Sequence, residues 1–263
     1  MEIKTKSLVN GILLLVTLVI NAMGATGLIN GLSQKEISDM YPTLITPSSS
    51  TFSIWSVIYT FLIVSIIVMI IKNKDAYYKR AINEISFLFW VSCALNIMWI
   101  ISFSYNLIGL SLILIAAFLI VMTLIVKRIG EFHIKKRWLL PIAFGLYSGW
   151  LFIATVVNVA AWLVKVEWSG WGISAEIWSS IILLISVGLT LIVLLNIKNA
   201  IFPIPIAWAY FGIYNNLTST IQGNYDMIQN VALIGIVFLI VLTVFQFYRN
   251  QLNIMPDISV KKN

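Results

Sequence analysis

The stretch that decides the fold is "TPSSSTFSIWSVIYTF", from Thr46 to Phe61, where a polar loop with a proline turns into an apolar run that continues to Ile71. Similar apolar runs recur along the whole chain. Of its 263 residues, 60% are hydrophobic and 10% are charged, and the mean hydropathy is +0.97. This composition excludes a water-soluble globular domain and indicates an integral membrane protein.

Eight apolar runs are candidate membrane spans, since crossing a hydrocarbon layer of about 30 Å takes roughly 20 helical residues. They cover residues 8–30, 51–71, 85–105, 107–126, 138–164, 175–197, 201–217 and 230–248. Backbone groups must be paired within lipid, and the runs lack the strict alternation of barrel strands, so each predicts an α-helix. We therefore expect an all-α integral membrane protein with about eight transmembrane helices.

The charged residues predict the orientation. Eight spans place both termini on one side of the membrane, and all of the 17 Lys and Arg residues except Lys35 and Lys165 then fall on that side. Positive charge is retained in the cytoplasm, so both termini are expected there. The net charge of +7 then reflects orientation and gives no reason to expect a nucleic-acid partner. An Ile-, Asn- and Lys-rich chain with this bias and no organelle-targeting presequence suits a bacterial plasma membrane.

Reactive side chains are scarce in the expected spans. The single histidine, His133, lies in the basic loop "KRIGEFHIKKR", and the single cysteine, Cys93, lies inside the third span. One isolated His supplies no metal-ligand set, and one Cys forms no intrachain disulfide. No acid and base residues are paired for catalysis. We therefore expect no catalytic or metal site, and an apolar or aromatic ligand rather than a hydrophilic substrate.

Aromatic and amide side chains recur at helical spacing in three spans, which places each set on one helix face. The sets are Trp55 and Tyr59; Asn96, Trp99 and Phe103; and Tyr147, Trp150, Ala154 and Asn158. The expected topology puts all three in the outer half of the membrane. Buried amides need partners, so Asn96 and Asn158 should bond to each other, to backbone or to a ligand. The alternative interpretation is an interfacial aromatic belt with polar residues that only join helices.

Three segments resemble, in order, the first loop with the second helix, the third helix and the fifth helix of the tryptophan-rich sensory protein or translocator protein (TspO/MBR) family. They are "TPSSSTFSIWSVIY", "LNIMW" and "PIAFGLYSGWLFIATVVNVAAW". The resemblance covers about residues 8–165 and implies a five-helix bundle with an aromatic pocket capped by the first loop. The ligand-binding residues it implies are Trp55, Tyr59, Asn96, Trp99, Phe103, Trp150, Ala154, Thr155 and Asn158, with Pro47 shaping the lid.

The ligand implied by this resemblance is a porphyrin, either protoporphyrin IX or a heme-like tetrapyrrole, and the implied role is sensory or regulatory. Light-dependent porphyrin breakdown, proposed for some members, is an expectation from resemblance alone. Membrane lipid and a hydrophobic small molecule are the expected partners. Dimerisation is common in the family, so a homodimer is a further expectation, although three added helices could cover the surface it uses.

The expected domains are therefore a TspO-like five-helix membrane domain, 1–165, a three-helix membrane extension, 166–248, and a cytoplasmic tail, 249–263. Within the extension, Trp208, Phe211 and Asn215 repeat the spacing of the third-span set, which suggests a second aromatic site. The alternative function is that of a secondary transporter or exporter of a hydrophobic metabolite that uses all eight helices.

Overall fold

The computed structural model describes residues 1–219 and 225–258, and within them all regular structure is helical. Residues 259–263 of the predicted tail, with Lys261 and Lys262, lie outside the described residues. The helices are α1 (Ile3–Ala25), α2 (Gln34–Asp39), the 3-10 turn η1 (Ser49–Ser53), α3 (Ile54–Ile71), α4 (Ala76–Ser104), α5 (Ile108–Gly130), α6 (Leu139–Lys165), the 3-10 turn η2 (Gly170–Gly172), α7 (Ala175–Ile197), α8 (Pro203–Ser219) and α9 (Asp226–Arg249).

Seven helical segments of the described chain are long and apolar enough to cross a membrane, namely α1, η1 with α3, α4, α5, α6, α7 and α9. They confirm the expected all-α membrane protein. The remaining expected span corresponds to α8, whose 17 residues extend about 26 Å at 1.5 Å per residue. Its first residue is Pro203, at a position where the missing N–H costs no helical hydrogen bond.

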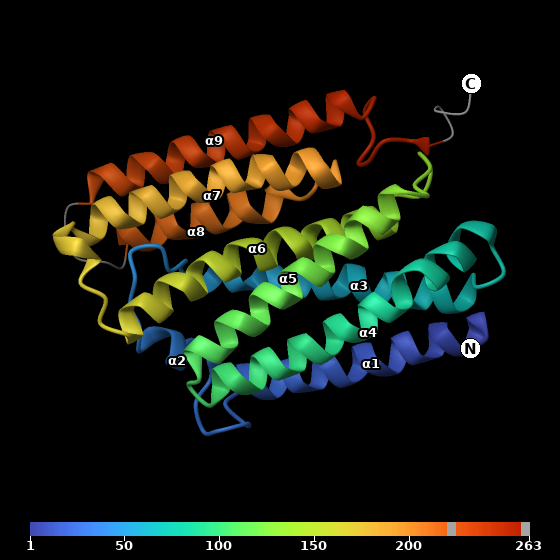
Figure 1. The fold of residues 1–263 in the computed structure, drawn as a ribbon, viewed down its shortest axis with the longest axis horizontal. Helices are drawn as coiled ribbons and strands as arrows, with labels where there is room; N and C mark the ends of the chain where they lie inside the picture. The colour runs from blue at the N-terminus through green and yellow to red at the C-terminus, as the bar shows by residue number, and fades with distance from the viewer. Residues whose placement is uncertain (220–224, 259–263) are drawn as a thin grey trace.

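The chain runs back along α8 between the end of α7 and the start of α9 (Figure 1). As a result, the first residues of α1 and the last residues of α9 lie at the same end of the bundle (Figure 1). This arrangement is the one that eight passes produce. Which side of the membrane holds this end remains a prediction from the charge distribution.

Helix α6 is the centre of the packing, with contacts to α3, α5, α7 and α8. On one side, α4 packs between α1 and α5; on the other, α9 packs against α7 and α8 (Figure 1). The outer faces of α7 and α9 expose apolar side chains, among them Leu184, Ile192, Val237 and Val244. Such faces are suited to contact with lipid tails.

Two glycines of α6 let the extension approach closely. A Cβ atom at Gly149 would lie 2.1 Å from the Phe202 carbonyl oxygen, and one at Gly145 would lie 2.7 Å from Asn199 Oδ1. Asn199 Nδ2 also donates to the Pro141 carbonyl oxygen at 2.9 Å. Small residues four positions apart are a common way for membrane helices to pack at short range. The two predicted parts, 1–165 and 166–248, therefore pack directly on each other.

Candidate ligand-binding site

The aromatic faces predicted on three separate spans meet around Trp55 of α3. Its ring centroid lies 5.1 Å from Tyr59 in a stacked arrangement, 6.5 Å from Trp99 of α4 and 6.0 Å from Trp150 of α6. Trp99 in turn lies 6.4 Å from Phe103. The structure thus brings aromatic rings from each of the three predicted sets into one layer near the end of the bundle opposite the termini.

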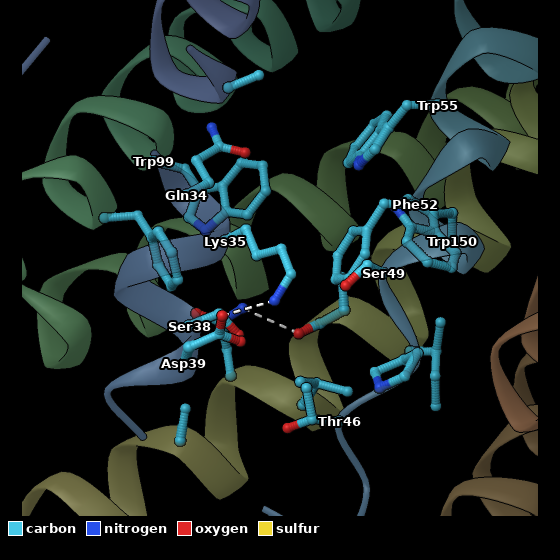
Figure 2. Close-up of a pocket in the computed structure, with 18 residues that line it drawn as sticks. Gln34, Lys35, Ser38, Asp39, Thr46, Ser49, Phe52, Trp55, Trp99 and Trp150 are labelled. Atoms are coloured by element: carbon cyan, nitrogen blue, oxygen red, sulfur yellow. Dashed lines mark hydrogen bonds and ion pairs between the residues drawn. The ribbon is translucent and has the colours of Figure 1, made fainter. Parts of the chain in front are cut away.

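A cavity of about 350 Å³ lies between this layer, α2 and the loop before α3. Figure 2 shows Phe52, Trp55 and Trp150 on one side of it, and Trp99 beside α2 on the other side. Its volume falls in the usual range for small-molecule pockets. The lining residues are Ala25, Gln34, Lys35, Ser38, Asp39, Thr46, Pro47, Ser49, Phe52, Trp55, Trp99, Phe103, Trp150, Ile153, Ala154, Val157, Asn158 and Ala161.

The cavity reaches the surface beside the short helix α2. Lys35 and Asp39 form an ion pair of 2.5 Å there, with side chains 54% and 56% exposed (Figure 2). The start of α2 is fixed by a capping box, in which Ser33 Oγ accepts from the Glu36 backbone N–H and Glu36 Oε2 accepts from the Ser33 N–H. The Ser33 backbone N–H and then the Ser33 hydroxyl, which also donates to Glu36 Oε2 at 2.7 Å, lower the pKa of Glu36.

Sequence reasoning missed the contribution of α2 to the site. The signal was present, because "SQKE" at residues 33–36 has the spacing of a capping box and therefore predicts a helix start. That helix places Gln34, Lys35, Ser38 and Asp39 on the cavity.

Most of the predicted ligand-binding residues line the cavity. They are Pro47, Trp55, Trp99, Phe103, Trp150, Ala154 and Asn158. The other three, Tyr59, Asn96 and Thr155, are not part of its wall. The Thr155 hydroxyl donates to the Leu151 carbonyl oxygen within α6 at 2.7 Å.

Tyr59 and Asn96 belong to a hydrogen-bonded network one helical turn further into the bundle. The Tyr59 hydroxyl donates to Asn21 Oδ1 at 2.8 Å, and Asn21 Nδ2 donates to Asn96 Oδ1 at 2.5 Å. Asn96 Nδ2 then donates to the Tyr147 hydroxyl at 3.0 Å. The network joins α1, α3, α4 and α6. It lies next to the aromatic layer, on the side nearer the middle of the bundle.

Asn158 has protein partners of its own. Its Nδ2 donates to the Ala154 carbonyl oxygen at 3.0 Å, and its Oδ1 accepts from the Ser111 hydroxyl at 3.3 Å. Of the partners expected for the two amides, Asn96 thus takes side chains of α1 and α6, while Asn158 takes a backbone carbonyl and a hydroxyl of α5. The two amides do not bond to each other.

Three buried nitrogen atoms on residues that line the cavity have no hydrogen-bond partner in the described part of the chain. They are Gln34 Nε2, Trp99 Nε1 and Trp150 Nε1. Indole nitrogen is a donor only, and an unpaired buried donor costs roughly 1–3 kcal/mol. These three atoms are covered by neighbouring atoms and are not themselves exposed to the open volume of the cavity.

The residues proposed for a second aromatic site, Trp208, Phe211 and Asn215, lie on α8 outside the cavity. The Trp208 indole N–H donates to the Thr51 carbonyl oxygen at 2.8 Å, and Phe211 is half exposed, with its ring 5.8 Å from Trp208. Neither these two nor Asn215 lines the cavity described above. Trp208 is turned toward the loop of the first site.

A comparison with protein families gives a match that contains the three segments on which the resemblance was based. A family model described as TSPO-like protein matches residues 7–245. The match contains the three helices of the aromatic layer, and it continues through α7, α8 and most of α9. A search of curated proteins and a search of solved structures each found no match to the chain.

Proposed function

The chain belongs to the TSPO-like protein family, and on that premise we propose that its cavity binds a hydrophobic aromatic ligand such as a porphyrin in a sensory or regulatory role. The observation that carries the proposal is a cavity of about 350 Å³ walled by aromatic rings from α3, α4 and α6. Trp55, Trp99 and Trp150 offer faces and edges to a flat ring, and such contacts contribute roughly 0.5–1.5 kcal/mol each beyond area burial. The small side chain of Ala154 leaves room for its approach.

The polar groups of the site favour a ligand that carries carboxylate or carbonyl oxygens. The unpaired Trp99 and Trp150 indole nitrogens and Gln34 Nε2 are all donors; they are covered by neighbouring atoms, so a ligand oxygen reaches them only if their side chains shift. The half-exposed Lys35 adds a positive charge at the mouth, where it is shared with Asp39. A porphyrin with propionate groups combines an extended aromatic face with such acceptors.

A titration of the purified protein in detergent with protoporphyrin IX tests the proposal. The porphyrin absorption band and Trp fluorescence are followed for wild type, Trp99→Ala and Asn158→Ala. Trp138→Ala is the matched control, because Trp138 is 53% exposed at the start of α6, away from the cavity. Thermal unfolding verifies that each variant folds.

We expect saturable binding at micromolar concentration or tighter. Trp99→Ala should weaken it about fivefold or more, since loss of one aromatic contact costs roughly 1 kcal/mol or more, and Trp138→Ala should leave it unchanged. Absence of saturable binding, or binding that ignores both cavity variants, would reject the proposal. Flux assays in liposomes would then test the transporter alternative.

A further inference from the structure

The loop that closes the cavity is attached to α8 of the extension. Three hydrogen bonds connect them: Trp208 Nε1 to the Thr51 carbonyl oxygen at 2.8 Å, the Ser48 N–H to the Gly212 carbonyl oxygen at 3.0 Å, and Asn216 Nδ2 to the Thr46 carbonyl oxygen at 3.0 Å. The three α8 residues are spaced at i, i+4 and i+8, so they form one face of the helix. One face of α8 is thus matched to the backbone of residues 46–51.

The fit between this face and the loop is close. A Cβ atom at Gly212 would lie 2.0 Å from Thr51 Oγ1 and 2.7 Å from Thr51 Cγ2. Thr51 is only 2% exposed, and its hydroxyl lies 3.0 Å from the Ser48 hydroxyl. The absence of a side chain at Gly212 is what allows the loop backbone to reach the helix.

The opposite side of the same loop forms the cavity wall. Thr46, Pro47 and Ser49 line the cavity, followed by Phe52 from the same 3-10 turn. Phe52 lies 6.0 Å from Trp150 in an edge-to-face contact. The chain then enters α3, which carries Trp55. The loop therefore lies between α8 and the ligand position, and a shift of α8 would change the cavity wall.

We propose that α8 is a positioning element for the ligand cavity: its Trp208, Gly212 and Asn216 face holds residues 46–51 in the conformation that binds the ligand. None of these three residues lines the cavity, so their effect on affinity passes through the loop. The part of this inference that concerns ligand affinity rests on the proposed function. It explains how helices beyond the resemblance to a five-helix bundle take part in the same site.

The test compares Trp208→Phe and the double variant Trp208→Phe/Asn216→Ala with wild type. Phenylalanine keeps an aromatic ring at this partly exposed position and removes the indole N–H that donates to Thr51. Trp178→Phe is the matched control, because the Trp178 indole N–H also donates to a backbone carbonyl of the extension, that of Gly170 at 2.7 Å. Hydrogen–deuterium exchange of the ligand-free protein measures the loop, and the porphyrin absorption band measures the affinity for protoporphyrin IX.

We expect faster exchange confined to the amides of residues 48–51 and a roughly 3- to 10-fold weaker affinity in the double variant, as loss of one or two partly buried hydrogen bonds predicts. Trp178→Phe should change neither. Unchanged loop exchange in the double variant would overturn the proposal, and so would faster exchange with unchanged affinity. Faster exchange spread evenly over α8 and α9 would show a general structural role and overturn it as well.

Failure of the proposed function gives a different result. If wild type does not bind protoporphyrin IX, the affinity arm falls with the proposed function. The exchange data on the ligand-free protein then still decide whether α8 holds the loop.

Discussion

Single glycines set the distances between α8 and its neighbours. Gly212 faces Thr51 of the loop, and Gly149 of α6 faces the Phe202 carbonyl oxygen just before α8. Gly235 of α9 lies against the ring of Tyr210, where an added Cβ would be 2.5 Å from the nearest ring carbon. On each side of α8, therefore, a missing side chain allows contact at short range.

Gly212→Ala is expected to destabilise the protein by roughly 1–3 kcal/mol, because the added methyl group would overlap Thr51 and force the loop away. Thermal unfolding in detergent measures the loss. The control is Gly188→Ala in α7, where a Cβ atom would meet nothing within 4 Å. There, the higher helix propensity of alanine should leave stability unchanged or raise it by up to about 1 kcal/mol. Equal unfolding temperatures for the two variants would contradict the close fit at Gly212.

At the scale of elements, the start of α4 is joined to the connection between α5 and α6. Asp75 caps α4, with Oδ1 accepting from the Tyr77 and Tyr78 backbone N–H groups at 3.0 and 3.2 Å. Its Oδ2 accepts from Arg137 Nη2 at 2.7 Å, and the guanidinium lies over both tyrosine rings. Burial opposes the charge of this carboxylate, but the bonds from the Tyr78 N–H and Arg137 outweigh it and hold the pKa of Asp75 below its usual range.

The lowered pKa of Asp75 predicts a loss of stability in acid. Since the folded-state pKa lies below the unfolded value, the contribution is present above about pH 4 and is lost as the pH falls through the lowered pKa. Asp75→Asn keeps a good helix cap and removes the charge. It should cost about 0.5–1 kcal/mol at pH 7, and the difference from wild type should shrink at pH 3.

Thermal unfolding at the two pH values checks this expectation. Glu131→Gln is the control, since its ion pair with Arg128 is about half exposed and should contribute little. A difference between wild type and Asp75→Asn that is the same at pH 3 and pH 7 would contradict the assignment.

In the molecule as a whole, α8 determines at which end of the bundle the last helix finishes. With 17 residues it is shorter than each of the seven segments of the described chain that are long enough to cross a membrane. It nevertheless returns the chain so that the start of α1 and the end of α9 share one end of the bundle (Figure 1). The turn after α1 and the cavity then lie at the other end. The positive-inside pattern predicts that the end with the termini faces the cytoplasm.

Cysteine labelling tests this orientation. In a Cys93→Ala background, Leu28→Cys and Lys74→Cys place single thiols at opposite ends; both parent residues are exposed, and Cys93 itself is buried. A membrane-impermeant maleimide added to intact bacterial cells should label Leu28→Cys, and should label Lys74→Cys only after the cells are disrupted. The reverse pattern would place the cavity on the cytoplasmic side.

The membrane fold and much of the cavity wall could be predicted because the signals are local. Apolar runs predicted the helices, helical spacing predicted the separate faces that carry Trp55, Trp99 and Trp150, and the expected topology predicted that these faces meet in one layer. The contribution of α2 was missed since its six residues carry no apolar periodicity, although the Ser33 to Glu36 capping box is readable. The role of Asn21 and the bond from Trp208 to Thr51 depend on contacts between distant segments, which periodicity within one span does not encode.

The bond between Thr51 and Trp208 joins positions 157 residues apart, and this separation has a consequence for biogenesis. A ribosome releases the loop and α3 into the membrane long before it makes α8. From the completion of α6 until α8 is made, the nascent chain contains the aromatic layer but lacks the helix that holds the loop of residues 46–51. A chain terminated after α6 would retain every residue predicted from the five-helix resemblance, and its site would stay in this immature state.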